Sequence, residues 1–158
     1  MKLPLAILIL IYSLLFSLTA SADDTLTFDN PWIPEAPPGA RVMAGYMEIS
    51  NHATKTIDIV SISSEAFDHV EMHLSKESDG FAQMLPQKKL SIPANGKLVL
   101  TSGSFHLMLI KPVKWFKHGD NIKLRLTLSN NETLPLEMRV KKTTPQKMKC
   151  AAGKCGAN

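Results

Sequence analysis

The stretch Asn121-Ile122-Lys123-Leu124-Arg125-Leu126-Thr127-Leu128 alternates polar and apolar residues without a break. Successive side chains of a β-strand point to opposite faces, so its aliphatic side chains would share one face and its polar side chains the other. Strict alternation of this kind is typical of a strand with one buried and one solvated face. The stretch therefore predicts a β-strand of an antiparallel sheet.

Short runs of similar character fill the chain on both sides of this stretch, between residues 41 and 140. They are separated by residues that favour turns, at Pro93 to Gly96, His118 to Asp120 and Asn130-Asn131. Short strands at regular spacing indicate an all-β fold, a single antiparallel β-sandwich. The expected strands are 44–50, 56–62, 68–74, 80–85, 97–100, 106–110, 121–128 and 133–139.

The N-terminus has the three parts of a secretory signal peptide. Lys2 precedes a nearly uninterrupted apolar stretch that ends at Leu18, and Ala20-Ser21-Ala22 supplies an A-x-A cleavage site. The apolar stretch is shorter than the roughly 20 residues that a membrane helix needs. We expect residues 1–22 to be removed on export and the mature protein to reside in the periplasm without a stable membrane anchor.

The remaining 136 residues have the length of one domain, with 17 basic and 14 acidic residues. A charge excess this small gives no indication of a nucleic-acid partner. We expect a β-sandwich domain over residues 23–141 and a flexible tail over residues 142–158, which is basic and has almost nothing apolar to bury. A monomer is expected.

Both cysteines of the chain, Cys150 and Cys155, lie in this tail together with Met148. A disulfide suits an oxidising compartment, and soft thiolates could equally bind a soft metal ion, so both interpretations stay open. A redox-active pair is the weakest interpretation, since the spacing differs from C-x-x-C. The three residues are secondary candidates for metal binding.

His106 and Met108 are the first candidate metal ligands. They stand two residues apart in a predicted strand, so they share a face, with α-carbons roughly 6.5 Å apart. Phe105, Leu107 and Leu109 would face the core instead. A neutral thioether favours copper(I), which imidazole also suits, whereas harder ions prefer carboxylate or oxygen ligands. The pair therefore indicates a copper(I) site.

Two residues upstream complete a longer pattern. His73 is followed by ten residues and Met84, and Met84 by 21 residues and His106-Leu107-Met108, which gives H-x10-M-x21-H-x-M. This spacing resembles the signature of the periplasmic copper chaperone A(C) family. The resemblance continues through Pro31-Trp32, Pro37 to Ala40, Ala44 to Met47, Asn51 and Gly119-Asp120. Unlike many relatives, the chain has Leu74 directly after His73, and its tail is not rich in histidine, which puts a copper(II) role for the tail in doubt.

The resemblance implies a cupredoxin-like or immunoglobulin-like Greek-key sandwich that binds copper(I). It implies a chaperone that hands the ion to another protein, such as a cytochrome c oxidase subunit or a second copper chaperone, during oxidase assembly. The implied ligands are His73, Met84, His106 and Met108.

Other candidates are set aside on spacing. His69 lies about 13 Å along the strand from His73, too far for one mononuclear site. Glu71 could orient a ligand imidazole, but an exposed carboxylate is the favoured interpretation. His52 and His118 are expected at solvated turns. The remaining methionines and both tryptophans are expected in the core or beside the site.

Three other functions are alternatives to copper delivery. Copper storage or resistance would use the same site without delivery to an oxidase. A blue-copper electron carrier needs a cysteine thiolate, which residues 23–149 lack. A purely structural sandwich would show no response to metal. The sequence contains no nucleophile elbow, catalytic triad order or zinc-protease helix, so we expect a binding protein and not an enzyme.

Overall fold

The computed structural model describes residues 25–78 and 81–143. Within them the chain forms only strands and connections, and no helix has the length and apolarity needed to cross a bilayer. The strands are β1 (Leu26–Pro34), β2 (Val42–Asn51), β3 (Ile57–Ser63), β4 (Phe67–Ser78), β5 (Phe81–Gln87), β6 (Leu90–Ile92), β7 (Lys97–Leu100), β8 (Phe105–Pro112), β9 (Asn121–Leu128) and β10 (Thr133–Lys141).

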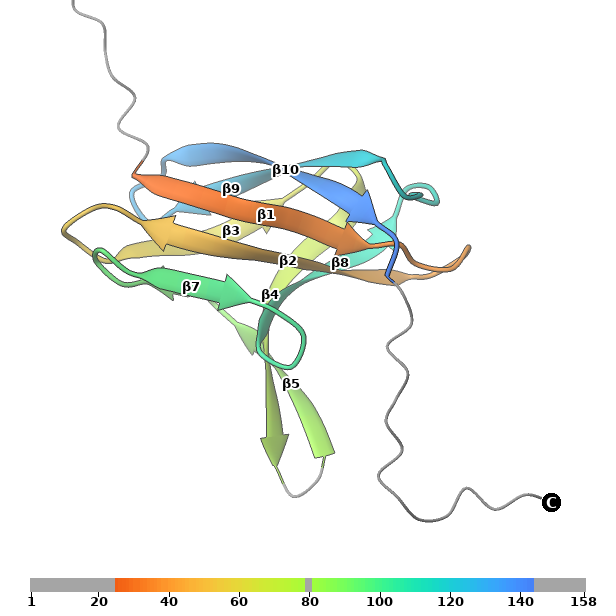
Figure 1. Cartoon of the computed structure of the whole chain (residues 1–158), viewed down its shortest axis with the longest axis horizontal. Helices are drawn as coiled ribbons and strands as arrows, with labels where there is room; N and C mark the ends of the chain where they lie inside the picture. Colours follow the sequence, from red (N-terminus) through yellow and green to blue (C-terminus); the bar gives the residue numbers. More distant parts are fainter. Residues whose placement is uncertain (1–24, 79–80, 144–158) are drawn as a thin grey trace, which may run out of the picture.

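The strands form one continuous sheet in the order β5-β4-β8-β7-β2-β1-β10-β9-β3-β6, with β2 also pairing β8. Figure 1 shows this sheet folded over on itself into two layers, with β9 and β10 lying across from β2 and β7. Most pairs are antiparallel, while β1 pairs β10 and β7 pairs β8 in parallel. The hairpin of β4 and β5 projects beyond the body of the sandwich (Figure 1). The all-β sandwich expected from the sequence is confirmed.

The two layers meet closely at Gly45. A β-carbon built there would lie 3.3 Å from the Leu107 Cβ and 3.3 Å from the Met138 Cε, so the absence of a side chain lets β10 pack onto β2 and β8. Met138 and Leu107 are completely buried, as is Leu126 from the alternating stretch. Burial of such side chains stabilises the fold by about 1.5–3 kcal/mol each.

Two of the predicted strands have the same bounds in the structure. Residues 97–100 and 121–128 are strands over the predicted ranges, while β4, β8 and β10 extend further than expected. The list of eight strands lacked β1 and β6. β1 contains Pro31 and changes register between Asp29 and Trp32, with Asn30 in the left-handed region, and β6 is only three residues long.

The three predicted turns carry the backbone geometry that their residues favour. Asn95, Asn131 and Gly119 have φ angles of 49°, 66° and 95°. Asparagine and glycine tolerate this left-handed region better than other residues do. These turns connect β6 to β7, β9 to β10 and the segment after β8 to β9.

Asn51 ties the end of β2 to the neighbouring connections. Its side chain is only 1% exposed. The Nδ2 group donates to the carbonyls of Lys55, Ile92 and Pro93 at 2.9–3.0 Å. Its Oδ1 accepts from the Ala53 N–H at 2.9 Å. The side chain thus satisfies four backbone groups, of which the Ile92 carbonyl is fully buried.

Replacing Asn51 with alanine is expected to lower the free energy of unfolding by about 2–4 kcal/mol, because several buried backbone groups lose their partner at once. Urea denaturation followed by circular dichroism measures the change, with an unchanged m-value. His52→Ala, at the exposed neighbouring position, is the control and should change stability by less than about 0.5 kcal/mol. A loss below 1 kcal/mol for Asn51→Ala would show that water replaces the amide.

Candidate copper site

His73 and His106 face each other across the pair of strands β4 and β8. Their residues are direct partners in the antiparallel register. The ring centroids lie 5.9 Å apart at an interplanar angle of 55°. An ion bound to an imidazole nitrogen at about 2.0–2.1 Å lies about 3 Å from that ring's centroid. Two rings that share one ion therefore have centroids up to about 6 Å apart, which the observed separation satisfies.

Both methionines of the pattern reach the same side of the sheet. Met108 lies two residues from His106 on β8 and opposite Glu71 on β4. Met84 on β5 pairs with Ser75, which lies two residues beyond His73 on β4. Because side chains alternate along and align across strands, all four residues share one face.

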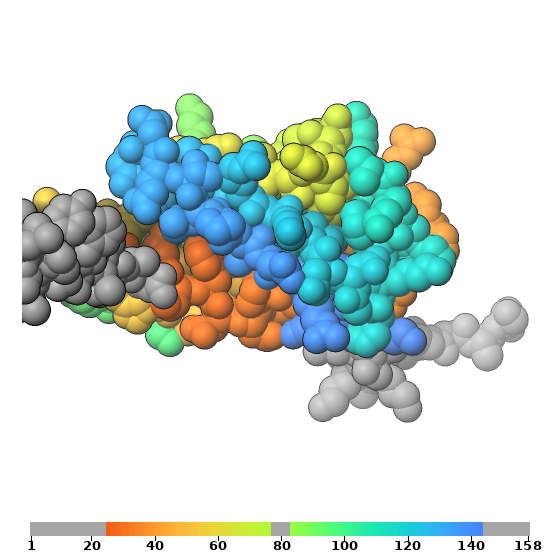
Figure 2. All heavy atoms as spheres, turned by 90° about the horizontal axis from the view of Figure 1, so that it is seen from above, coloured from red at the N-terminus to blue at the C-terminus, as the bar shows by residue number. Residues whose placement is uncertain are grey.

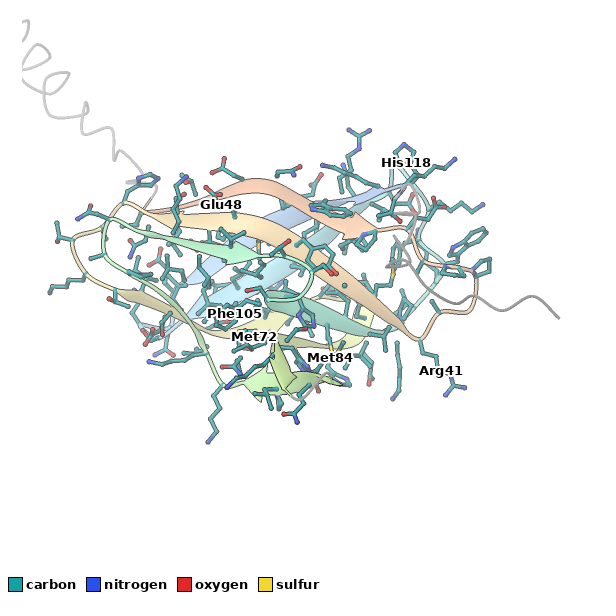
Figure 3. All side chains as sticks on the ribbon, turned by 60° about the horizontal axis from the view of Figure 1, so that its bottom comes forward. Arg41, Glu48, Met72, Met84, Phe105 and His118 are labelled. Atoms are coloured by element: carbon teal, nitrogen blue, oxygen red, sulfur yellow. The ribbon has the colours of Figure 1, made fainter. Side chains whose placement is uncertain are left out.

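A small pocket joins three of the four residues. It has a volume of about 230 Å³, and its lining includes Met84, His106 and Met108 together with Tyr46 and Ser75. In Figure 3 Met84 lies on the projecting hairpin. Strand β5 thus places the Met84 thioether at the same pocket as His106, while His73 lies beside His106 and does not line the pocket.

The His106 ring is fixed by a backbone carbonyl. Its Nδ1 lies 3.0 Å from the Ser104 oxygen, which can only accept, so Nδ1 carries the proton. The Nε2 atom then keeps its lone pair free. A hydrogen bond of this kind sets the tautomer and orientation of a metal-binding imidazole.

The His73 ring is fixed by Glu71. The Nε2–H of His73 donates to the Glu71 carboxylate at 2.7 Å. This leaves Nδ1 as the nitrogen with a free lone pair, and Nδ1 is buried without a hydrogen-bond partner among the described residues. A buried polar atom without a partner is costly. A bound ion would supply that partner, so the residues present fit a metal.

The two histidines and the two methionines differ in their exposure to solvent. His73 and His106 are buried, at 8% and 6% exposure, whereas Met84 is 59% exposed. Met108 is partly buried. The two imidazoles are therefore the enclosed donors of the set, and the Met84 thioether is the most accessible one.

Other polar residues form a network outside this pocket. His69 is half-exposed and contacts Asp68 at 3.0 Å and Glu71 at 3.3 Å. The hydrogen bond from His69, with the ion pair to Lys111, holds the pKa of the Asp68 carboxyl below its ordinary value. Glu71, left unassigned on sequence grounds, therefore bridges His69 to His73. His69 itself stays outside the pocket, as expected.

The remaining candidates lie elsewhere. His52 and His118 are exposed at turns, and His52 contacts the Thr27 hydroxyl at 3.0 Å. Met43, Met47 and Met138 are core residues, as predicted. Met148, Cys150, Cys155 and the expected signal peptide lie outside the described residues. Sequence reasoning missed Tyr46 and Ser75, because only the cross-strand register brings them to the pocket.

The fold and the four-residue pattern on one face define a domain of the periplasmic copper chaperone A(C) type, as the resemblance implied. The chain belongs to the family described as "Putative lipoprotein LpqE-like", whose model matches residues 26–140. It is also 27% identical over 119 residues to the "Putative lipoprotein Lxx21020" of Leifsonia xyli subsp. xyli, covering 75% of this chain and 70% of that protein.

Solved structures of similar fold come from the same class. The copper-bound PCuAC domain from PmoF2 matches with a TM-score of 0.64 at 16% identity, covering 75% of this chain and 94% of the domain. The apo-DR1885 protein from Deinococcus radiodurans matches with a TM-score of 0.59 at 27% identity, covering 75% of this chain and 80% of that one. The copper(I) form, CuI-DR1885, matches at 24% identity and a TM-score of 0.58.

Proposed function

We propose that this protein is a periplasmic copper(I) chaperone that holds one ion with His73, Met84, His106 and Met108 and passes it to an acceptor protein. The observation that carries this proposal is the direct pairing of His73 with His106, each with one unprotonated nitrogen, beside a pocket lined by both methionines. Copper-bound structures exist for domains of the same fold.

The donor set explains the choice of ion. Two imidazoles and two thioethers are neutral, so these four ligands bring no negative charge to the site. Hard or strongly charged ions prefer the carboxylate or thiolate ligands that this set lacks. Thioethers are soft and favour copper(I), which is the cargo here and not a resident catalytic cofactor. The arrangement supplies binding and shielding, which supports a role as a carrier and not as an enzyme.

The unequal exposure supports transfer. The buried imidazoles are held by hydrogen bonds to Ser104 and Glu71, so they form the fixed part of the site. Met84 is exposed on the hairpin, where an incoming ligand of an acceptor can displace its sulfur without opening the fold. The ion would thus leave on the Met84 side.

The test is anaerobic titration of the exported protein with copper(I) in competition with a chromophoric chelator. A Cys150→Ser/Cys155→Ser variant is titrated in parallel, so that binding by the tail is separated from binding by the body. The proposal requires one tight equivalent in both proteins. Loss of that equivalent with the cysteines would contradict the assignment to the body.

Delivery is tested in cells. We propose a cytochrome c oxidase subunit or another copper chaperone as the acceptor. A deletion strain grown in low copper should then lose oxidase activity and recover it when copper is added. Sensitivity to excess copper with normal oxidase activity would instead identify a storage or resistance protein.

Glu71 is expected to tune the site without binding the ion. Glu71→Ala removes the acceptor that fixes the His73 ring and should lower the copper(I) affinity by about 10–100-fold, as loss of a partner of a ligand imidazole typically does. Asp68→Ala, on the same strand but bonded to His69 and Lys111, is the matched control and should change affinity less than threefold. Equal affinities for wild type and Glu71→Ala would remove Glu71 from the site.

A further inference from the structure

A second hollow lies at the end of the sandwich, next to the copper pocket. It has a volume of about 440 Å³ and lies between the connection from β1 to β2 and the segment that follows β8. Figure 2 shows these two segments side by side at one end of the molecule. Met43 lines both this hollow and the copper pocket. The hollow and the copper pocket therefore adjoin the same stretch of β2.

The floor of the hollow is apolar and held in place. Trp115 is 45% exposed, yet its indole N–H donates to the Ala36 carbonyl at 3.0 Å, which joins the two segments. Phe116 packs on the core residue Phe67 with ring centroids 5.6 Å apart. An exposed tryptophan in a fixed orientation is typical of residues that anchor a protein partner.

The rim of the hollow is cationic. Arg41, Lys111 and Lys114 line it, and no carboxylate residue does. Arg41 points away from the body of the molecule in Figure 3. Lys111 pairs with Asp68, whereas no ion pair among the described residues includes Arg41 or Lys114. The Lys114 ammonium lies over the Phe116 ring, 5.3 Å from its centroid, and a cation held in this way can still accept an anionic ligand.

The backbone holds this rim in an unusual conformation. Lys111 has a φ angle of 51°, a region that residues other than glycine and asparagine rarely adopt. Its N–H donates to the Arg41 carbonyl at 2.7 Å, so the strained residue is locked onto the opposite segment. Backbone strain of this kind clusters at binding sites.

We infer that this hollow docks an acidic segment of the copper acceptor, with an apolar side chain against the exposed Trp115 and carboxylates beside Arg41 and Lys114. The inference rests on the proposed function, since it names the partner of the same site. A concave hollow accepts protruding side chains of a protein, whereas a bilayer surface is flat. Cations on the rim would steer an acidic partner toward the copper pocket.

The test uses the copper-free full chain labelled with ¹⁵N. The probe is the peptide acetyl-Glu-Phe-Glu-Glu-Phe-Glu-amide, with lysine in place of glutamate in the control peptide. The acidic peptide should shift the amide signals of residues 36–43 and 111–117 in a saturable way, and the basic peptide should not. The Arg41→Glu/Lys114→Glu variant should bind the acidic peptide at least tenfold more weakly than the wild type. The Lys55→Glu/Lys88→Glu variant, with an equal charge change at exposed positions elsewhere, should lose less than threefold in affinity for this peptide.

Three results would overturn the inference: shifts scattered over the surface, equal binding of both peptides, or equal loss in the two double variants. Cosedimentation with phosphatidylglycerol vesicles in the absence of peptide shifts would also overturn it and assign the hollow to a membrane. Copper(I) affinity of the Arg41→Glu/Lys114→Glu protein is measured separately. An unchanged affinity there keeps the proposed ion site, whatever the peptide result.

Discussion

Replacing His106 and Met108 together with alanine is expected to lower the copper(I) affinity by at least about 100-fold, equivalent to about 2.7 kcal/mol of binding free energy. These two residues supply a nitrogen and a sulfur from one strand. Their loss leaves His73 and Met84, which lie on neighbouring strands and are not direct partners: His73 pairs with Pro86, and Met84 pairs with Ser75. Two remaining donors cannot enclose the ion, so solvent and competing chelators gain access to it.

The measurement is the same anaerobic competition titration, carried out in the Cys150→Ser/Cys155→Ser background. His52→Ala/His118→Ala is the control, because it removes two exposed imidazoles that lie at turns. The control should retain the wild-type affinity within about threefold. Similar losses in both double variants would mean that copper binds to surface histidines and not at the paired residues.

Copper(I) itself is expected to stabilise the fold by about 4 kcal/mol when the free ion exceeds its dissociation constant 1,000-fold. The proposed ligands come from β4, β5 and β8, and they converge only in the folded state. It would also supply the missing partner of the buried His73 Nδ1. For a domain of this size, such a gain raises the melting temperature by well over 5 °C.

Differential scanning calorimetry under anaerobic conditions, with and without copper(I), measures this stabilisation. The His106→Ala/Met108→Ala protein should show a shift below about 2 °C at the same copper concentration. An equal shift in that variant would place the stabilising ion elsewhere in the chain. A purely structural sandwich would show no shift at all.

The sequence predicted the strands well where alternation was strict and poorly where it was interrupted. The strand over residues 121–128 has one buried face, and its pattern is complete. β1 was missed because Pro31 and the register change after Asp29 break its pattern locally, while pairing with β2 and β10 restores the strand. Long-range pairing of this kind cannot be read from local periodicity.

The candidate site was predictable in part. Spacing placed His106 and Met108 on one face, and both line the same pocket in the structure. The direct pairing of His73 with His106 depends on the register of β4 against β8, which no local pattern fixes. Glu71 was left unassigned because its hydrogen bond to His73 depends on a side-chain rotamer. The hydrogen bond that orients the His106 ring is accepted by the backbone carbonyl of Ser104. The identity of residue 104 does not predict such a bond, because every residue has a backbone carbonyl.

We propose that two imidazoles and two thioethers hold one copper(I) ion together. X-ray absorption spectroscopy of the copper(I)-loaded Cys150→Ser/Cys155→Ser protein counts these donors, because sulfur in that variant can come only from methionine. Two nitrogen and two sulfur scatterers are expected around the ion, and one sulfur fewer in Met108→Ala. A shell of nitrogen and oxygen alone would contradict this proposal.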